Sequence, residues 1–271
     1  MLTRVIVGVL GIPLLLFVLL VLPPVCLPVI LAALCCIAAH ECMYATGEVR
    51  HKGLVGLSMA MAILVPFWYY FGLDHLAGFA GVFAFFLGMS ILAISSHQTI
   101  KFGQMGIALF AGLLIPGMLS VFVLLSDLEH GKLFILLPFV SAFSSDAFAL
   151  FAGMAFGKHK LAPKLSPKKT IEGSVGGFLA SAVMCALYGV IVGRFWGHSA
   201  NYPALVIYGM LASVVSQLGD LSFSYIKREA GIKDYGRFLP GHGGVLDRFD
   251  SVIFCAPFTY IVVMLLPLFR F

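Results

Sequence analysis

The apolar stretch MGIALFAGLLIPGMLSVFVLL, residues 105–125, decides the class of fold. It contains no charged residue and is long enough to cross the hydrocarbon core of a membrane, which takes about 20 residues of helix. Similar stretches recur on both sides of it, and hydrophobic residues make up 61% of the chain against 11% charged residues. A water-soluble domain of this composition would expose large apolar patches, so we expect a protein embedded in lipid.

The crossing segments are expected to be helices. Lipid cannot pair with backbone N–H and C=O groups, which leaves helices or a closed barrel, and these apolar runs lack the alternation of barrel strands. The sequence therefore predicts an all-α, polytopic integral membrane protein with about nine transmembrane helices and two long cytosolic loops. We expect one transmembrane domain, residues 1–271, with a catalytic half at about 140–255. The expected spans are 5–22, 25–40, 54–72, 76–94, 105–125, 132–154, 174–194, 203–226 and 250–268.

The basic residues predict the orientation of these spans. Nine spans place 14 of the 17 Lys and Arg residues on the side of the N-terminus, and three on the other side. Because basic loops stay cytoplasmic, the long loops 157–173 and 227–247 are expected in the cytosol. We therefore expect the protein in the cell (inner) membrane, with its active site facing the cytoplasm.

Two carboxylates stand out well inside expected spans, where a charge costs about 2.5–3.5 kcal/mol on insertion scales. Asp146 follows two serines in the span 132–154, and it is equally well interpreted as a cap at a kink or a partner for a neighbouring helix. Asp220 has more support, because it belongs to a set of polar residues at helical spacing, which predicts one polar stripe facing a wet cavity or polar partners. The stripe consists of Ser213, Ser216, Asp220, Ser224 and Lys227.

The last long loop has the composition of a phosphate and metal site. Its second half reads KDYGRFLPGHGGVLDRFD, residues 233–250. Glycines let a backbone wrap closely around a ligand, and the flanking cations suit phosphates. Asp247 and Asp250 form a carboxylate pair suited to Mg²⁺, although Asp250 is equally well interpreted as a helix cap. Among the histidines only His242, between glycines, is a candidate functional residue.

The other long loop reads GKHKLAPKLSPKKTIEG, residues 157–173. Its lysines are compatible with simple anchoring to anionic head groups, worth about 1 kcal/mol per charge. The segment SPKKTIEG indicates more, because Pro163 before it and Pro167 within it keep the chain extended and a glycine-rich helix start follows. Together the two loops bring carboxylates, cations and glycine backbone to one membrane face.

Residues 224–250 contain the pattern S-x-x-K-R-x4-K-D-x-G-x2-L-P-x-H-G-G-x2-D-R-x-D, and residues 156–173 contain GKHKLAPK and SPKKTIEG. Both resemble the motifs of the phosphatidate cytidylyltransferases, also called CDP-diacylglycerol synthases. The resemblance implies that CTP and phosphatidate react to CDP-diacylglycerol and pyrophosphate with Mg²⁺ required, a step of phospholipid biosynthesis. It places the family's metal-binding acids on Asp220 and Asp247 and its loop lysine on Lys169, while Lys168 receives no role. A homodimer would fit the family.

These arguments give a set of expected site residues. We expect Mg²⁺ at Asp220 and Asp247, with Asp146 and Asp250 as further candidate ligands. The expected partners are CTP, phosphatidate and membrane lipid, and no nucleic acid. The expected catalytic residues are Lys169, Lys227, Arg228 and His242. The expected substrate-binding residues are Ser166, Thr170, Ser224, Lys233, Asp234, Gly243, Gly244 and Arg248.

Two other functions remain open from the residues alone. Another Mg²⁺-dependent lipid transferase would also use paired aspartates, but neither D-G-x-x-A-R nor D-D-x-x-D occurs in the sequence. An ion-coupled transporter would place Asp146 and Asp220 in its pathway. It leaves the long glycine and lysine loops unexplained.

Overall fold

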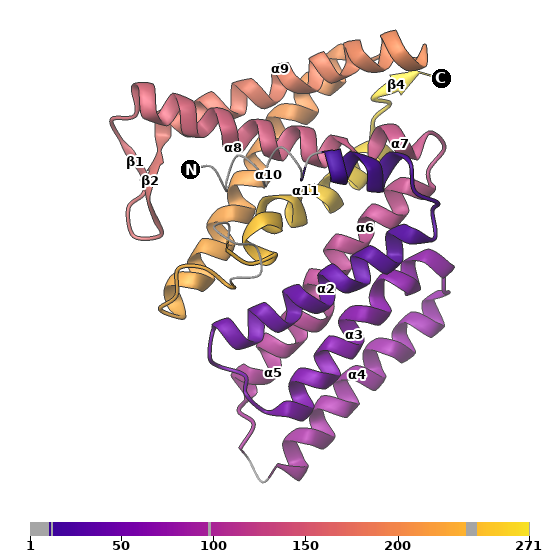
Figure 1. Ribbon diagram of the computed structural model, residues 1–271, viewed down its shortest axis with the longest axis vertical. Helices are drawn as coiled ribbons and strands as arrows, with labels where there is room; N and C mark the ends of the chain where they lie inside the picture. Colours follow the sequence, from indigo (N-terminus) through magenta and orange to yellow (C-terminus); the bar gives the residue numbers. More distant parts are fainter. Residues whose placement is uncertain (1–10, 12, 97–98, 237–242, 271) are drawn as a thin grey trace. The chain divides into compact units, whose positions relative to one another are not determined.

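A computed structural model describes residues 11, 13–96, 99–236 and 243–270 of the chain (Figure 1). The chain divides into two compact units, each of which is described by itself. The first consists of residues 1–127 and 229–248, and the second of residues 128–228 and 249–271. The expected catalytic half therefore has residues in both units, and the single transmembrane domain stays a prediction.

The elements of the first unit that the structure describes are mainly helices. A short π-helical turn, η1, joins α5 to α6, so that these three elements form one long segment (Figure 1). Gly112 in this turn lies against α3, where an added Cβ would come 3.0 Å from the Ser58 backbone. The helices are α2 (Cys26–Ala45), α3 (Lys52–Phe71), α4 (His75–Ser95), α5 (Phe102–Leu109), η1 (Phe110–Leu114) and α6 (Ile115–Asp127).

The second unit adds two short antiparallel strand pairs to its helices. Strand β1 pairs with β2 as a hairpin, and β3 pairs with β4 near the C-terminus. Helix α11 begins in the last residues of the first unit and continues through the second. The elements are α7 (Gly131–Phe134), α8 (Leu137–Phe156), β1 (Lys160–Ala162), β2 (Ser166–Thr170), α9 (Ile171–Trp196), β3 (Ser199–Ala200), α10 (Tyr202–Glu229), α11 (Leu246–Leu265) and β4 (Phe269–Arg270).

Eight helical segments among the described residues are long and apolar enough to cross a membrane. They coincide with the last eight of the nine expected spans, which confirms the prediction of a polytopic, all-α membrane protein. Residues 5–10 and 12 of the first expected span, 5–22, lie outside the described residues, while residues 13–20 of it are helical. Large apolar side chains such as Leu76, Phe79 and Ile94 of α4 are exposed, as lipid-facing residues are expected to be.

Small residues allow α8 and α9 to approach each other closely. An added Cβ on Gly177 would lie 2.6 Å from the carbonyl oxygen of Ser145, and one on Gly176 would lie 2.3 Å from the Cβ of Ala152. Small residues at such contacts are the usual means of packing membrane helices, because lipid provides no hydrophobic drive between them. This contact fixes the position of the polar segment Ser144 to Asp146 on α8.

Candidate functional site

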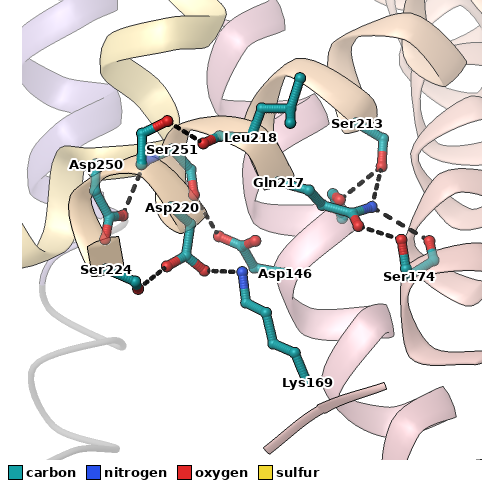
Figure 2. Close-up of polar contacts among 12 residues, drawn as sticks. Asp146, Lys169, Ser174, Ser213, Gln217, Leu218, Asp220, Ser224, Asp250 and Ser251 are labelled. Carbon is teal, nitrogen blue, oxygen red and sulfur yellow. Dashed lines mark hydrogen bonds and ion pairs between the residues drawn. The ribbon is translucent and has the colours of Figure 1, made fainter. Parts of the chain in front are cut away.

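A cluster of charged side chains gathers in the second unit from four separate elements (Figure 2). Asp146 comes from α8, Lys169 from β2, Asp220 from α10 and Asp250 from α11. The Lys169 ammonium group forms an ion pair with Oδ2 of Asp220. The hydroxyl of Ser224, one helical turn further along α10, donates a hydrogen bond to Oδ1 of Asp220 over 3.2 Å. Both carboxylate oxygens of Asp220 therefore have partners from this unit.

The two other carboxylates of the cluster have partners on α10 and α11. The Ser251 hydroxyl donates to Oδ2 of Asp146 over 3.2 Å, and the Ser251 backbone N–H donates to Oδ1 of Asp250 over 2.8 Å. Nζ of Lys227 lies 4.0 Å from Oδ2 of Asp250. The side chains of Lys227 and Asp250 are only 11% and 12% exposed. Asp146 thus bonds to a neighbouring helix, as one interpretation of the sequence expected, whereas Asp250 lies inside α11 rather than at its cap; metal binding by either acid stays a prediction.

The expected polar stripe runs along one face of α10. Ser213, Ser216, Ser224 and Lys227 are all buried, which confirms the periodicity argument. The sequence analysis missed Gln217 beside this stripe. Its amide group donates to the Ser174 carbonyl over 3.2 Å and to the Ser213 hydroxyl over 3.1 Å, and its oxygen accepts from the Ser174 hydroxyl. The signal that could have found it is its position, three residues before Asp220.

An apolar cavity of about 350 Å³ adjoins this polar pair between α9 and α10. Val175 and Phe178 line it from α9, Val214 and Leu218 from α10, and Leu161 from the hairpin. Ser174 and Gln217 are its polar lining residues. The polar cluster and an apolar cavity therefore share the same stretch of α10.

The hairpin that contains Lys169 is held at several points. The Thr170 hydroxyl accepts from the Gly173 backbone N–H over 3.1 Å and caps the N-terminus of α9. The Glu172 carboxylate accepts from the backbone N–H groups of Lys158 and His159 over 3.1 and 3.2 Å. It also bonds to Nδ1 of His159 over 2.7 Å. Glu172 is a second residue that the sequence analysis missed, and its contacts fix the base of the hairpin.

A link from α10 holds the far end of the hairpin. Nε of Arg228 donates to the carbonyl oxygen of Leu165 over 3.1 Å, in the turn between β1 and β2. Strand β2 follows the turn and contains Pro167, which confirms the extended conformation expected for this segment. Ser166 is half-buried at the start of the strand, and Lys168 is exposed. Arg228 thus helps to position Lys169, and its own expected contact with phosphates stays a prediction.

Asp247 organises the glycine loop in the first unit. Its Oδ2 accepts from the backbone N–H of Tyr235 over 2.7 Å and from that of Gly244 over 3.0 Å. Gly243 has φ +83°, a left-handed conformation that glycine adopts without strain. An added Cβ there would also lie 2.9 Å from Oδ2 of Asp247.

The remaining expected site residues of this loop are exposed or lie outside the described residues. Lys233, Asp234 and Arg248 are exposed, and His242 lies outside the described residues. Asp247 belongs to the first unit and Asp220 to the second, so their sharing of one metal ion stays a prediction. Among the described residues no group of three or more His, Cys, Asp or Glu side chains is arranged to hold a metal ion.

Comparison with known proteins matches residues 2–266 to the cytidylyltransferase family. The chain is 34% identical over 216 residues to the phosphatidate cytidylyltransferase of Bacillus subtilis, covering 79% of this chain and 78% of the relative. It is 36% identical over 171 residues to the protein of that name from Rickettsia prowazekii, covering 62% and 75% of the two chains. The protein of that name from Thermotoga maritima is 36% identical over 139 residues, or 51% and 52% of the two chains.

Proposed function

This chain belongs to the cytidylyltransferase family, and we propose that it transfers the cytidylyl group of CTP to phosphatidate, which gives CDP-diacylglycerol and pyrophosphate. The observation that carries the proposal beyond the family match is the cluster of Lys169, Asp220, Lys227 and Asp250 inside a unit of membrane-crossing helices. Placing charged side chains among membrane helices costs free energy. They are therefore expected where they have a function, such as the binding of charged substrates.

The proposed reaction requires the protein to position two phosphate groups and to offset their negative charge. An oxygen of the phosphatidate phosphate attacks the α-phosphorus of CTP, and the bond from that phosphorus to the β-phosphate bridging oxygen breaks. Pyrophosphate leaves with the electron pair of this bond. Several negative charges meet in the process, so catalysis consists mainly of positioning and of offsetting charge. Lys169 and Lys227 are the cations of the cluster that bind and orient the phosphates.

The donor set fits Mg²⁺ as the required ion. Carboxylate oxygens are the ligands that this hard cation prefers, and it is commonly bound by one or two carboxylates together with substrate phosphates. Asp220 and Asp247 would hold the ion. Asp146 and Asp250 are further candidate ligands, because both belong to the cluster that contains Asp220 and because Asp250 follows Asp247 by three residues. Bound there, Mg²⁺ would offset the charge of the leaving pyrophosphate.

The lipid substrate accounts for the location of the cluster. Phosphatidate carries its phosphate at the membrane surface and its acyl chains in the hydrocarbon core. The apolar cavity of about 350 Å³ beside Gln217 suits a segment of acyl chain next to the polar cluster. A transporter would need neither this cavity nor the anchored hairpin, so the transferase is favoured.

The protein is an integral membrane protein, and we place its active site at the cytosolic face of the cell membrane. The support is the distribution of basic residues, 14 of 17 on the side of both long loops. CTP would then reach the site from the cytosol, while phosphatidate enters from the bilayer. A homodimer stays a prediction.

The test is an assay of the purified protein in detergent micelles. CTP labelled in the cytidine is incubated with phosphatidate and Mg²⁺, and the lipid fraction and released pyrophosphate are measured. We expect labelled lipid and pyrophosphate in equal amounts, both dependent on phosphatidate and abolished by chelation of Mg²⁺. Label that enters lipid only when diacylglycerol or another alcohol replaces phosphatidate would show a different transferase.

A further inference from the structure

A buried carboxylate of the first unit contacts the backbone that leads into α11. Glu41 lies near the C-terminal end of α2 and is 7% exposed. Its Oε1 accepts from the backbone N–H of Val245 over 3.1 Å, and its Oε2 accepts from that of Leu246 over 2.9 Å. Two N–H groups at the start of α11, which have no partner within the helix, are thereby satisfied by one side chain more than 200 positions earlier.

The glycines of the loop leave room for this carboxylate. An added Cβ on Gly236 would lie 2.4 Å from Oε1 of Glu41, and one on Gly244 would lie 2.4 Å from Oε2. Both distances are far below van der Waals contact, so any larger residue would push the carboxylate away. The two glycines of the pattern are therefore required by the contact with Glu41 as well as by the backbone of the loop.

The contact is suited to a negative charge. The two N–H groups and the positive end of the α11 dipole both stabilise a negative charge on Glu41. Burying a carboxylate is costly unless it is hydrogen-bonded. A neutral amide of the same shape would accept only one of the two hydrogen bonds and would present an NH₂ group to the other N–H.

Asp247 holds the same stretch of backbone, residues 244–246, from a second direction. Its Oδ2 accepts from Gly244, while Glu41 accepts from Val245 and Leu246, so every backbone N–H from 244 to 246 ends on a carboxylate. Asp247 follows directly in the chain. A shift of residues 244–246 would therefore move the carboxylate that we expect to bind Mg²⁺.

We propose that Glu41 is a positioning residue, which fixes residues 244–246 and Asp247 in the conformation that binds CTP and Mg²⁺. It touches neither substrate and acts only through the backbone of residues 244–246. The proposal rests on the function proposed above. It assigns a role in the reaction to the N-terminal half of the chain, to which the sequence motifs gave none.

The first experiment tests the contact without reference to activity. Hydrogen–deuterium exchange is measured in detergent for the parent chain, for Glu41→Gln and for the control Glu48→Gln. Glu48 is exposed and lies shortly after the end of α2, seven residues after Glu41. The control therefore removes one negative charge from the same part of the chain without affecting the contact. We expect exchange in peptides covering residues 243–250 to accelerate about tenfold or more in Glu41→Gln alone, as for lost hydrogen bonds to a charged group. Unchanged exchange would overturn the proposal.

The second experiment separates positioning from folding. In Glu41→Gln we expect kcat/KM for CTP to fall about ten- to hundredfold and the Mg²⁺ concentration for half-maximal activity to rise. The KM for phosphatidate should stay within about twofold, and Glu48→Gln should resemble the parent in all three values. A merely structural role would reduce the amount of folded protein but leave the KM for CTP and the Mg²⁺ dependence of the folded fraction unchanged.

The outcomes distinguish this proposal from the proposed function. A parent chain that forms no CDP-diacylglycerol would refute the function, while hydrogen exchange would still decide whether Glu41 holds the loop. An active parent whose Glu41→Gln variant keeps normal KM and Mg²⁺ dependence would refute only the role of Glu41. The variant Glu41→Ala provides a check, since it loses both acceptors and should be at least as impaired as Glu41→Gln.

Discussion

Replacing Lys169 by alanine separates a catalytic role of the hairpin from a role as membrane anchor. Lys168 and Lys169 are neighbours on β2, and successive side chains of a strand point to opposite faces. Lys168 is exposed, whereas the Lys169 side chain is 27% exposed and forms the ion pair with Asp220. The chain thus contains a matched control one residue away, and Lys160 on β1 is a second exposed lysine of the same hairpin.

The expected magnitudes differ clearly. An anchoring lysine is worth about 1 kcal/mol, or about fivefold, and its effect weakens as salt increases. A cation that meets phosphates in a preorganised site is worth about 2.7–4 kcal/mol, or about a hundred- to a thousandfold in rate. The Lys169–Asp220 pair is partly exposed, with side chains 27% and 23% accessible, so screening favours the lower end of this range. We therefore expect a loss of about a hundredfold for Lys169→Ala.

The assay is CDP-diacylglycerol formation in detergent micelles across a range of salt. Lys168→Ala and Lys160→Ala should stay within a few fold of the parent at every salt concentration, while the deficit of Lys169→Ala should persist at high salt. Thermal unfolding of each variant in the same detergent monitors the loss of the ion pair. The double variant Lys169→Ala with Asp220→Asn removes both charges, so it should regain stability without regaining activity. Equal, mild and salt-dependent losses for all three lysines would refute the catalytic role.

Two further predictions concern the metal ligands and the orientation. Asp220→Asn and Asp247→Asn should each remove nearly all activity at ordinary Mg²⁺ while the protein remains inserted and folded, since the amide keeps the size but binds Mg²⁺ weakly; near-normal turnover in either variant would exclude that ligand. In a variant without the six native cysteines, a cysteine at Lys164 should resist membrane-impermeant thiol reagents in sealed cells, whereas one at the exposed Glu129 should react. Labelling of position 164 from outside would reverse the orientation.

Most of the helical architecture could be predicted because its cause is local. A run of about 20 apolar residues has few alternatives in lipid, so each expected span from 25–40 onward has its counterpart among the eight crossing segments. The hairpin of β1 and β2 could not be predicted as a pair. Its strands are three and five residues long, and its position depends on Glu172 at the base and Arg228 at the turn. Such contacts leave no periodic signal in the sequence.

In the candidate site, too, contacts between residues far apart in the sequence could not be predicted. Helical spacing was sufficient to place Ser213, Ser224 and Lys227 on the face of α10 that contains Asp220. Spacing could not show that Lys169, which belongs to β2, forms an ion pair with Asp220. Glu41 was missed for a further reason, because it stands at the end of an apolar span next to other polar residues, where a carboxylate normally faces water. Only its distances to Val245 and Leu246 reveal a partner.

The ion pairs of the second unit explain how the buried charges of the cluster can be stabilised both without substrates and with charged substrates bound. Lys169 pairs with Asp220 and Lys227 with Asp250, so the cost of holding charges among membrane helices is reduced before any substrate arrives. In the proposed reaction Lys169 and Lys227 would exchange their carboxylates for phosphates of the substrates, and Asp220 would be released to hold Mg²⁺. Both lysines would keep a partner of opposite charge throughout, so that little reorganisation is needed in the reaction itself. Neutralising one partner alone breaks this balance, which is why we expect Lys169→Ala and Asp220→Asn to be more harmful than the loss of an exposed lysine.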